Sequence, residues 1–202
     1  MSLNLRSSVP VRPLAIFALG AAVGLAGDAC HVVTGTTRYE PSWVPTVWES
    51  KLWFPLLVGG AVLAAAWAGR RAGLPAVRRR DRGDAILGAG VVLALYALTA
   101  LLLGTPDTLS VVWTAAIAIA VWAWWDPSPG ALLVAACAAV LGPVAEIALV
   151  ELGAAEYAAE ADGLGGVAPW LPCLYFAAGA VASGLWSALG VTRVTEGAVP
   201  GR

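Results

Sequence analysis

Six long apolar segments, separated by short polar ones, make up most of this chain of 202 residues. They lie near residues 13–33, 50–69, 84–103, 108–125, 130–151 and 169–191. Because an α-helix rises about 1.5 Å per residue, about 20 apolar residues cross a hydrocarbon core of about 30 Å. The pattern predicts an all-α, polytopic membrane protein in which a single six-transmembrane-helix bundle occupies residues 1–202.

Basic residues are divided unevenly between the two ends of this predicted bundle. One end has only Arg38 and Lys51. The opposite end has ten basic residues: Arg6, Arg12, Arg70, Arg71, Arg78, Arg79, Arg80, Arg82, Arg193 and Arg202. Cytoplasmic loops carry the excess of lysine and arginine in membrane proteins. We therefore expect both termini to be cytoplasmic.

The composition supports a membrane protein and excludes other classes. The chain is 59% hydrophobic and 12% charged, with a net charge of -1 and a mean hydropathy of +0.79. A soluble domain, a disordered chain and a nucleic-acid binder are all inconsistent with these values. Abundant alanine, and a single lysine beside eleven arginines, are typical of a GC-rich bacterial genome. We expect a multi-pass protein of the bacterial inner membrane.

Residues suited to catalysis or metal binding are scarce. Cys30, Cys137 and Cys173 fall inside predicted helices without metal-ligand spacing, so they are expected to be small buried residues and not disulfides. His31 is the only histidine, and no nucleophile–base or paired-carboxylate motif accompanies it. We predict no enzymatic activity, no metal and no cofactor.

Three ionisable side chains are predicted to lie inside the membrane at one depth. Asp28 and His31 share a face of the first helix, and Asp28 is about 22 Å from its start. Glu146 is about 24 Å from the start of the fifth helix, which runs in the same direction. The three groups fit the polar cap of a ligand cavity, a proton relay, or a cluster in which they satisfy one another.

Small residues form possible helix contacts. Gly20 and Gly24 permit close backbone approach along the first helix, which suggests a homo-oligomer contact or, equally, close packing within the chain. The arginine-rich segment 70–82 is expected to set topology and to lie against anionic lipid, without a specific ligand.

Several motifs in the order of the chain resemble those of the Insig (insulin-induced gene) family of sterol-sensing membrane proteins. They are Trp53-Phe54-Pro55 with Gly59; Gly73-Leu74-Pro75 followed by Arg79-Arg80-Asp81; Trp122-Ala123-Trp124-Trp125-Asp126 with Gly130; and Trp170-Leu171-Pro172-Cys173 with Phe176. The resemblance covers roughly residues 20–190, and the family has the same six spans with cytoplasmic termini.

The resemblance implies a bundle with a lipid-accessible cavity for oxysterol-like molecules and no chemistry. We expect Asp28, His31, Glu146 and Trp53 to contact the ligand. In animals such proteins hold a sterol-escort partner in the endoplasmic reticulum, and the aspartate needed for this contact falls on Asp126. The family has glutamine near Glu146.

The chain also departs from the family pattern. No basic residue follows Asp126, and Leu101-Leu102-Leu103 lacks the family's polar groups, so the animal partnership is not expected here. Bacteria mostly lack sterols, which makes a two-chain glycerolipid the expected occupant of an equivalent cavity, with an unidentified membrane protein as a further possible partner.

Two alternative functions remain open at this point. Pro41-Ser42-Trp43-Val44-Pro45 ahead of Trp48 resembles the tryptophan-rich translocator (TspO-like) type, which binds tetrapyrroles or sterols, although that family has five spans. A small proton-coupled transporter would instead use Asp28, His31 and Glu146 as its relay, but the chain lacks repeat symmetry.

Overall fold

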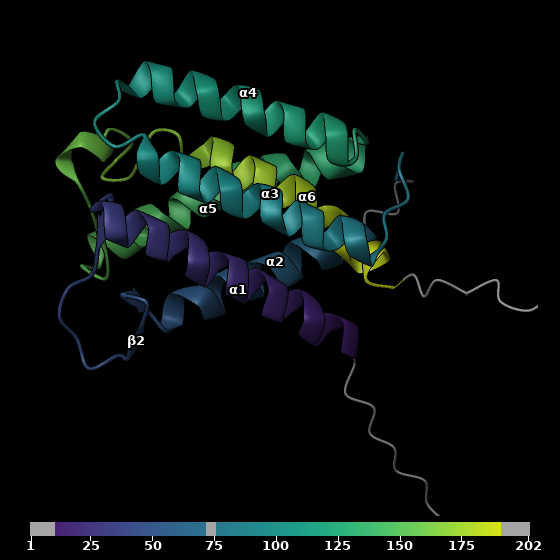
Figure 1. Cartoon of the computed structure of the whole chain (residues 1–202), viewed down its shortest axis with the longest axis horizontal. Helices are drawn as coiled ribbons and strands as arrows, with labels where there is room; N and C mark the ends of the chain where they lie inside the picture. Colours follow the sequence, from purple (N-terminus) through teal and green to yellow (C-terminus); the bar gives the residue numbers. More distant parts are fainter. Residues whose placement is uncertain (1–10, 72–75, 191–202) are drawn as a thin grey trace, which may run out of the picture.

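The computed structural model describes residues 11–71 and 76–190, and long helices account for most of them (Figure 1). The helices are α1 (Val11–Thr34), α2 (Trp53–Arg71), α3 (Arg82–Leu101), α4 (Asp107–Trp125), α5 (Pro129–Glu151) and α6 (Leu171–Ala188), with a 3-10 turn η1 (Ala159–Ala161). Within the described residues, six helices are long and apolar enough to cross a membrane. The predicted all-α, six-span fold is confirmed, and the chain is an integral multi-pass membrane protein.

The helix ends lie close to the predicted ones. α4 and α5 end at Trp125 and Glu151, as expected, whereas α2 was expected from residue 50 and begins at Trp53. The delay arises because Ser50–Lys51 form a short strand. Some expectations lie outside the described residues: Arg6, the Gly73-Leu74-Pro75 motif, the predicted end at residue 191, Arg193 and Arg202.

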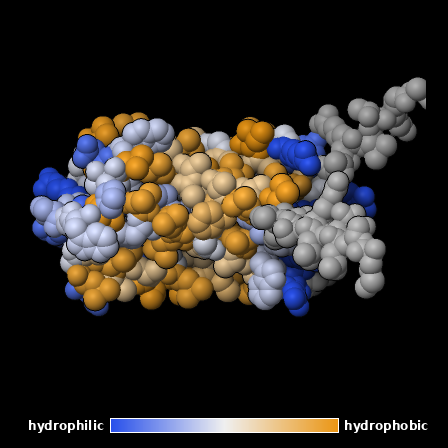
Figure 2. Space-filling view, turned by 90° about the horizontal axis from the view of Figure 1, so that it is seen from below, coloured by the Kyte–Doolittle hydropathy of each residue, from blue (hydrophilic) through white to orange (hydrophobic). Residues whose placement is uncertain are grey.

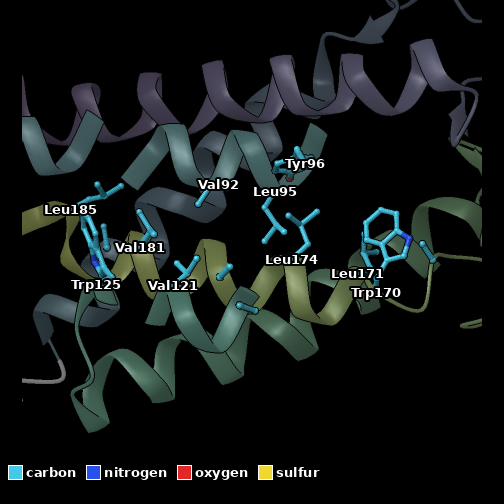
Figure 3. Close-up of a cluster of buried hydrophobic side chains, with 14 of the residues drawn as sticks. Val92, Leu95, Tyr96, Val121, Trp125, Trp170, Leu171, Leu174, Val181 and Leu185 are labelled. Carbon is cyan, nitrogen blue, oxygen red and sulfur yellow. The ribbon is translucent and has the colours of Figure 1, made fainter. Parts of the chain in front are cut away.

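Helix α6 occupies the centre of the bundle. It contacts α1, α2, α3, α4 and α5. Buried apolar side chains run along its length, from Trp125 and Leu185 near one end to Leu171 and Trp170 at the other (Figure 3). Small residues such as Ala177, Gly179 and Ala180 on α6 let the neighbouring helices approach closely.

The surface is divided as a membrane requires. On the face shown in Figure 2, hydrophobic side chains occupy the middle of the bundle and hydrophilic side chains lie at both ends. Among the exposed apolar residues are Leu56 and Leu57 on α2 and Val140, Leu141 and Val144 on α5. In lipid these side chains contact acyl chains and incur no hydrophobic penalty.

Gly20 and Gly24 pack inside the protomer, which corrects the expectation that they contact another copy of the chain. Both are buried in the α1–α2 interface. A Cβ atom at Gly20 would lie 2.7 Å from Cβ of Val62, and one at Gly24 would lie 2.7 Å from Cβ of Val58. The absence of side chains allows α1 and α2 to come together, so the glycine stripe has an intramolecular function.

Two short antiparallel ladders cover one end of the bundle. Strand β1 (Thr37–Arg38) pairs with β4 (Glu156–Tyr157), and β2 (Thr46–Val47) pairs with β3 (Ser50–Lys51). The β1–β4 pairing joins the loop after α1 to the loop after α5, which are about 120 residues apart in the chain. The hydropathy pattern did not predict these strands, because each is only two residues long.

Candidate functional site

A polar pocket lies beneath the β1–β4 ladder. Its free volume is about 10 Å³, which is room for about one water molecule. The polar and aromatic residues that line it come from helices and loops: Asp28, His31, Thr37, Tyr39, Trp53, Tyr96, Glu146, Tyr157 and Tyr175. The four residues predicted to contact a ligand, Asp28, His31, Trp53 and Glu146, thus lie around one pocket.

All four tyrosines of the chain, and its single histidine, line this pocket. Tyr39 and Tyr157 come from the loops, whereas Tyr96 and Tyr175 lie on α3 and α6. The motifs in the sequence did not single out these tyrosines. The composition offers one signal: the chain has ten tryptophans but only four tyrosines, so each phenol hydroxyl is a candidate for a specific hydrogen bond.

Asp28 is held by a residue of the first loop. It is 3% exposed, and the Tyr39 hydroxyl donates a hydrogen bond of 2.7 Å to its Oδ2 atom. The buried Ser50 lies beside both groups. Trp53 packs edge-on against the Tyr39 ring at 5.8 Å, so the indole fixes the phenol that reaches Asp28.

His31 is bonded to α3 and surrounded by aromatic rings. Its Nε2 atom lies 3.0 Å from Thr99 Oγ1, and the Thr99 hydroxyl itself donates to the carbonyl groups of Leu95 and Tyr96. The threonine oxygen therefore accepts, and Nε2 of the imidazole donates. The rings of Tyr96 and Trp170 lie 5.5 Å and 5.2 Å from the imidazole.

Glu146 is held from α6. The Tyr175 hydroxyl donates a hydrogen bond of 2.7 Å to its Oε1 atom, and Glu146 is 6% exposed. The Tyr175 ring lies directly against Gly142, one turn before Glu146 on α5, where a Cβ atom would overlap it. Tyr157 on β4 interacts with the same carboxylate.

The three ionisable groups do not bond to one another. Among the described residues, Asp28 bonds to Tyr39, His31 to Thr99 and Glu146 to Tyr175. The hypothesis that they satisfy one another directly is therefore wrong. Each is instead oriented by a separate partner on another element.

The loop residues of the pocket are hydrogen-bond donors at neutral pH. Burial, followed by the nearby Asp28 carboxylate, raises the pKa of Tyr39, and burial followed by Glu146 raises that of Tyr157. Both phenols therefore keep their protons. The buried hydroxyl of Thr37 also lines the pocket, and no group of the described residues accepts or donates a hydrogen bond to it. An unpaired buried hydroxyl is a place where a water or ligand atom binds favourably.

An apolar pocket of about 40 Å³ lies farther along the same helices. α1 contributes Leu19 and Val23, α3 contributes Ala89 and Val92, and the remaining lining residues are Gly20, Val62, Ala178, Val181, Ala182 and Leu185. It has no polar lining. α1, α3 and α6 line both pockets, so polar and apolar spaces follow one another along the bundle.

Asp126 has a structural function at the opposite end. It is 6% exposed, and its carboxylate accepts hydrogen bonds from the Val77 amide at 2.9 Å and the Ser128 hydroxyl at 3.1 Å. Ser128 in turn accepts from the Ala131 amide and caps α5. Both carboxylate oxygens are used within the chain, so the structure does not present Asp126 to a partner. Ser128 provides the N-terminal cap of α5, and Asp126 positions Ser128.

The bundle and its pockets define a class of protein: a six-helix membrane protein with a closed polar site next to an apolar one. The search against models of protein families found no match. The chain is 44% identical over 182 residues to an Insig protein homologue from Mycolicibacterium vanbaalenii, covering 88% of this chain and 86% of that protein.

Solved structures give the same answer. The crystal structure of the mycobacterial Insig homologue MvINS superposes with a TM-score of 0.83 at 39% identity, covering 89% of this chain and 94% of that one. A cross-linked MvINS trimer superposes with a TM-score of 0.82 at 40% identity, over 88% and 93%. The chain belongs to the Insig family.

Proposed function

We propose that this Insig protein binds an amphipathic lipid and acts as a membrane lipid sensor or regulator. The lipid's polar end enters the polar pocket and its chains extend into the apolar pocket. The observation that carries this proposal is the convergence of all four tyrosines, the only histidine and two carboxylates on one small space. A simple packing core has no use for so many hydrogen-bonding groups.

The chemistry of the polar pocket favours an uncharged, hydroxyl-bearing headgroup. The unpaired Thr37 hydroxyl supplies a donor, while the carboxyl oxygens of Asp28 and Glu146 supply acceptors. Two carboxylates in one pocket repel a phosphate group. A sterol hydroxyl or the free hydroxyl of a two-chain glycerolipid satisfies both conditions, and the glycerolipid suits a bacterial inner membrane.

The volumes of the two pockets require an opening movement. They are about 10 Å³ and 40 Å³, whereas pockets for small-molecule ligands commonly measure about 300–1,000 Å³. Binding must therefore separate α1, α3 and α6, or lift the β1–β4 ladder. Leu95 and Leu174, which lie together in the core, are the side chains that must move for a chain to pass (Figure 3).

The proposed role is regulatory and not catalytic, and it does not use the animal partner contact at Asp126. The cross-linked MvINS trimer suggests that this chain is also a homo-oligomer, built on a surface other than the buried Gly20 and Gly24. We place the protein in the inner membrane of a bacterium.

The alternatives fit less well. Insig membership makes the translocator-type interpretation wrong. A proton-coupled transporter needs a hydrogen-bonded path, yet among the described residues Asp28, His31 and Glu146 each bond to a different partner. Lipid binding uses this separate arrangement, because each group can contact a different part of one headgroup.

Native mass spectrometry tests the proposal. The purified protein is delipidated and then offered diacylglycerol, cholesterol or phosphatidylglycerol at equal concentrations. We expect the retention of diacylglycerol or cholesterol to be roughly tenfold weaker in Glu146→Gln, because an amide donor replaces one of the carboxyl oxygens that accept hydrogen bonds in the polar pocket. Retention of phosphatidylglycerol should be unchanged by this substitution. Glu151→Gln removes an exposed carboxylate from the same helix and serves as the control. Equal occupancy in all three proteins would overturn the proposal.

A further inference from the structure

Two arginines at the end of α2 lie against tryptophan rings. The guanidinium carbon of Arg70 is 4.7 Å from the ring centre of Trp186, and that of Arg71 is 5.0 Å from the ring of Trp67. α2 and α6 meet closely here, since a Cβ atom at Gly69 would lie 2.5 Å from the Ser183 carbonyl oxygen. We call Trp67, Arg70, Arg71 and Trp186 the α2–α6 shelf.

The stacking leaves the hydrogen-bonding edges of both guanidinium groups available. An indole ring contacts the flat face of the group, whereas the N–H donors point outward in its plane. Within the described part of the chain, no hydrogen bond or ion pair engages Arg70 or Arg71. Both side chains are exposed. The rings therefore hold two cations in place without neutralising them.

Arg80 also stacks on tryptophan rings, but its hydrogen-bond donors are used within the fold. It lies 5.0 Å and 4.9 Å from the rings of Trp124 and Trp125. Its Nε and Nη2 atoms also donate to the Trp125 carbonyl, at 3.0 Å and 2.8 Å, and Asp84 pairs with Nη1. Arg80 thus caps α4. Among the described residues, the shelf arginines have the same stacking but none of these hydrogen-bond acceptors.

The position of the shelf identifies the ligand chemistry. Trp67 is 50% exposed on the membrane-spanning helix α2, about one turn before the two arginines that end this helix. Tryptophan prefers the depth of lipid headgroups. A guanidinium group matches phosphate geometry by donating two parallel hydrogen bonds. The ligand must therefore be anionic and lie at headgroup depth.

We propose that the α2–α6 shelf binds the phosphate of an anionic phospholipid. Arg70 and Arg71 donate to the phosphate oxygens, and the exposed ring of Trp67 contacts the glycerol and upper acyl chain. This site is separate from the polar pocket, whose carboxylates disfavour phosphate. The protein would then bind an uncharged lipid in the polar pocket and an anionic lipid on the shelf. A substitution that abolishes binding at one site would leave the other site unaffected.

The test measures lipid retention on the full chain by native mass spectrometry after reconstitution with equal amounts of phosphatidylglycerol and phosphatidylcholine. The parent protein should retain phosphatidylglycerol preferentially. Arg70→Gln/Arg71→Gln should reduce that retention roughly 30-fold, because two arginines near an anionic headgroup contribute about 1 kcal/mol each. Arg79→Gln/Arg82→Gln removes two exposed arginines from the same end of the molecule and should have little effect.

Other outcomes would overturn the proposal. If both double variants lose phosphatidylglycerol equally, only the general positive charge of this end attracts lipid. Retention at the parent level in Arg70→Lys/Arg71→Lys would show that stacked guanidinium groups are unnecessary. Complete displacement of the lipid by a tenfold excess of inorganic phosphate would assign the shelf to the free ion. Thermal stability, measured in parallel, identifies any variant that fails to fold.

Discussion

Thr37 and Tyr157 face each other across the β1–β4 ladder, and both side chains line the polar pocket. The first follows α1 and the second follows α5, so one backbone pairing joins the two loops directly over Asp28 and Glu146. A ladder of two residues per strand is easily opened, because few hydrogen bonds hold it. The same contact therefore shapes the pocket, and we propose that its opening admits the lipid.

Covalent closure of this ladder should slow lipid exchange. Arg38 and Glu156 are the neighbouring exposed pair of the ladder, and they point away from the pocket. In a chain whose three cysteines are replaced by alanine, Arg38→Cys/Glu156→Cys places two thiols at cross-strand positions. We expect the oxidised form to load lipid at least roughly tenfold more slowly than the reduced form, measured with a fluorescent lipid. Equal rates would show that lipid enters sideways between helices.

Substitution of the buried glycines should destabilise the protomer. Gly24→Leu and Gly20→Leu place side chains against Val58 and Val62, where even a Cβ atom is too close. We expect a loss of about 1–3 kcal/mol at each site, seen as a lower melting temperature in detergent. Gly60→Leu, at a position with no heavy atom within 4 Å, is the control. A stable, well-folded monomer from Gly20→Leu/Gly24→Leu would instead assign these residues to an oligomer contact.

The glycines show what sequence reasoning leaves open. A stripe at helical spacing predicts close approach, but the same stripe serves a neighbouring helix or a second copy, and only the tertiary arrangement decides between them. The helices themselves were predictable, because runs of about 20 apolar residues have few other stable arrangements. The shared depth of Asp28 and Glu146 also followed from the helix rise alone.

The partners of those groups did not follow from sequence. Tyr39 reaches Asp28, and Tyr157 reaches Glu146, from loops whose conformation depends on a two-residue strand pairing. Asp126 was similarly ambiguous, because its hydrogen bond with the Val77 amide joins segments 49 residues apart. Local patterns specify the helix faces, whereas contacts between loops depend on the folded bundle.

Removing the Asp126 carboxylate should loosen the segment between α2 and α3. Asp126→Ala leaves the buried Ser128 and the Val77 amide without an acceptor, at an expected cost of about 1–3 kcal/mol in unfolding free energy. Asp126→Asn keeps one acceptor and should cost less. Trypsin cleavage after the exposed Arg79 should be faster in the alanine variant. If the variants keep their stability but no longer co-purify with another protein, Asp126 contacts a partner instead.

The orientation of the bundle is open to a labelling test. Asp162 and Arg79 are both exposed, at opposite ends. Among the described residues, the Arg79 end has seven arginines and the other end has only Arg38 and Lys51, so the positive-inside rule places the Arg79 end in the cytoplasm. In a cysteine-free chain, Asp162→Cys should react with an impermeant maleimide on intact cells, whereas Arg79→Cys should react only after permeabilisation. The reverse pattern would invert the assignment.

Filling the apolar pocket should separate the binding of lipid chains from that of the headgroup. Ala89→Leu on α3 extends into this 40 Å³ space, whereas Ala64→Leu on the exposed face of α2 does not and is the control. The new side chain should exclude two methylene groups of the lipid from the pocket, each of which contributes about 0.8 kcal/mol to the binding free energy. Retention of a long-chain diacylglycerol should therefore weaken roughly tenfold. A short-chain analogue with the same headgroup reaches only the polar pocket and should bind equally to both variants. Equal losses for both ligands would show that Ala89→Leu distorts the polar pocket, and no loss would place the chains elsewhere.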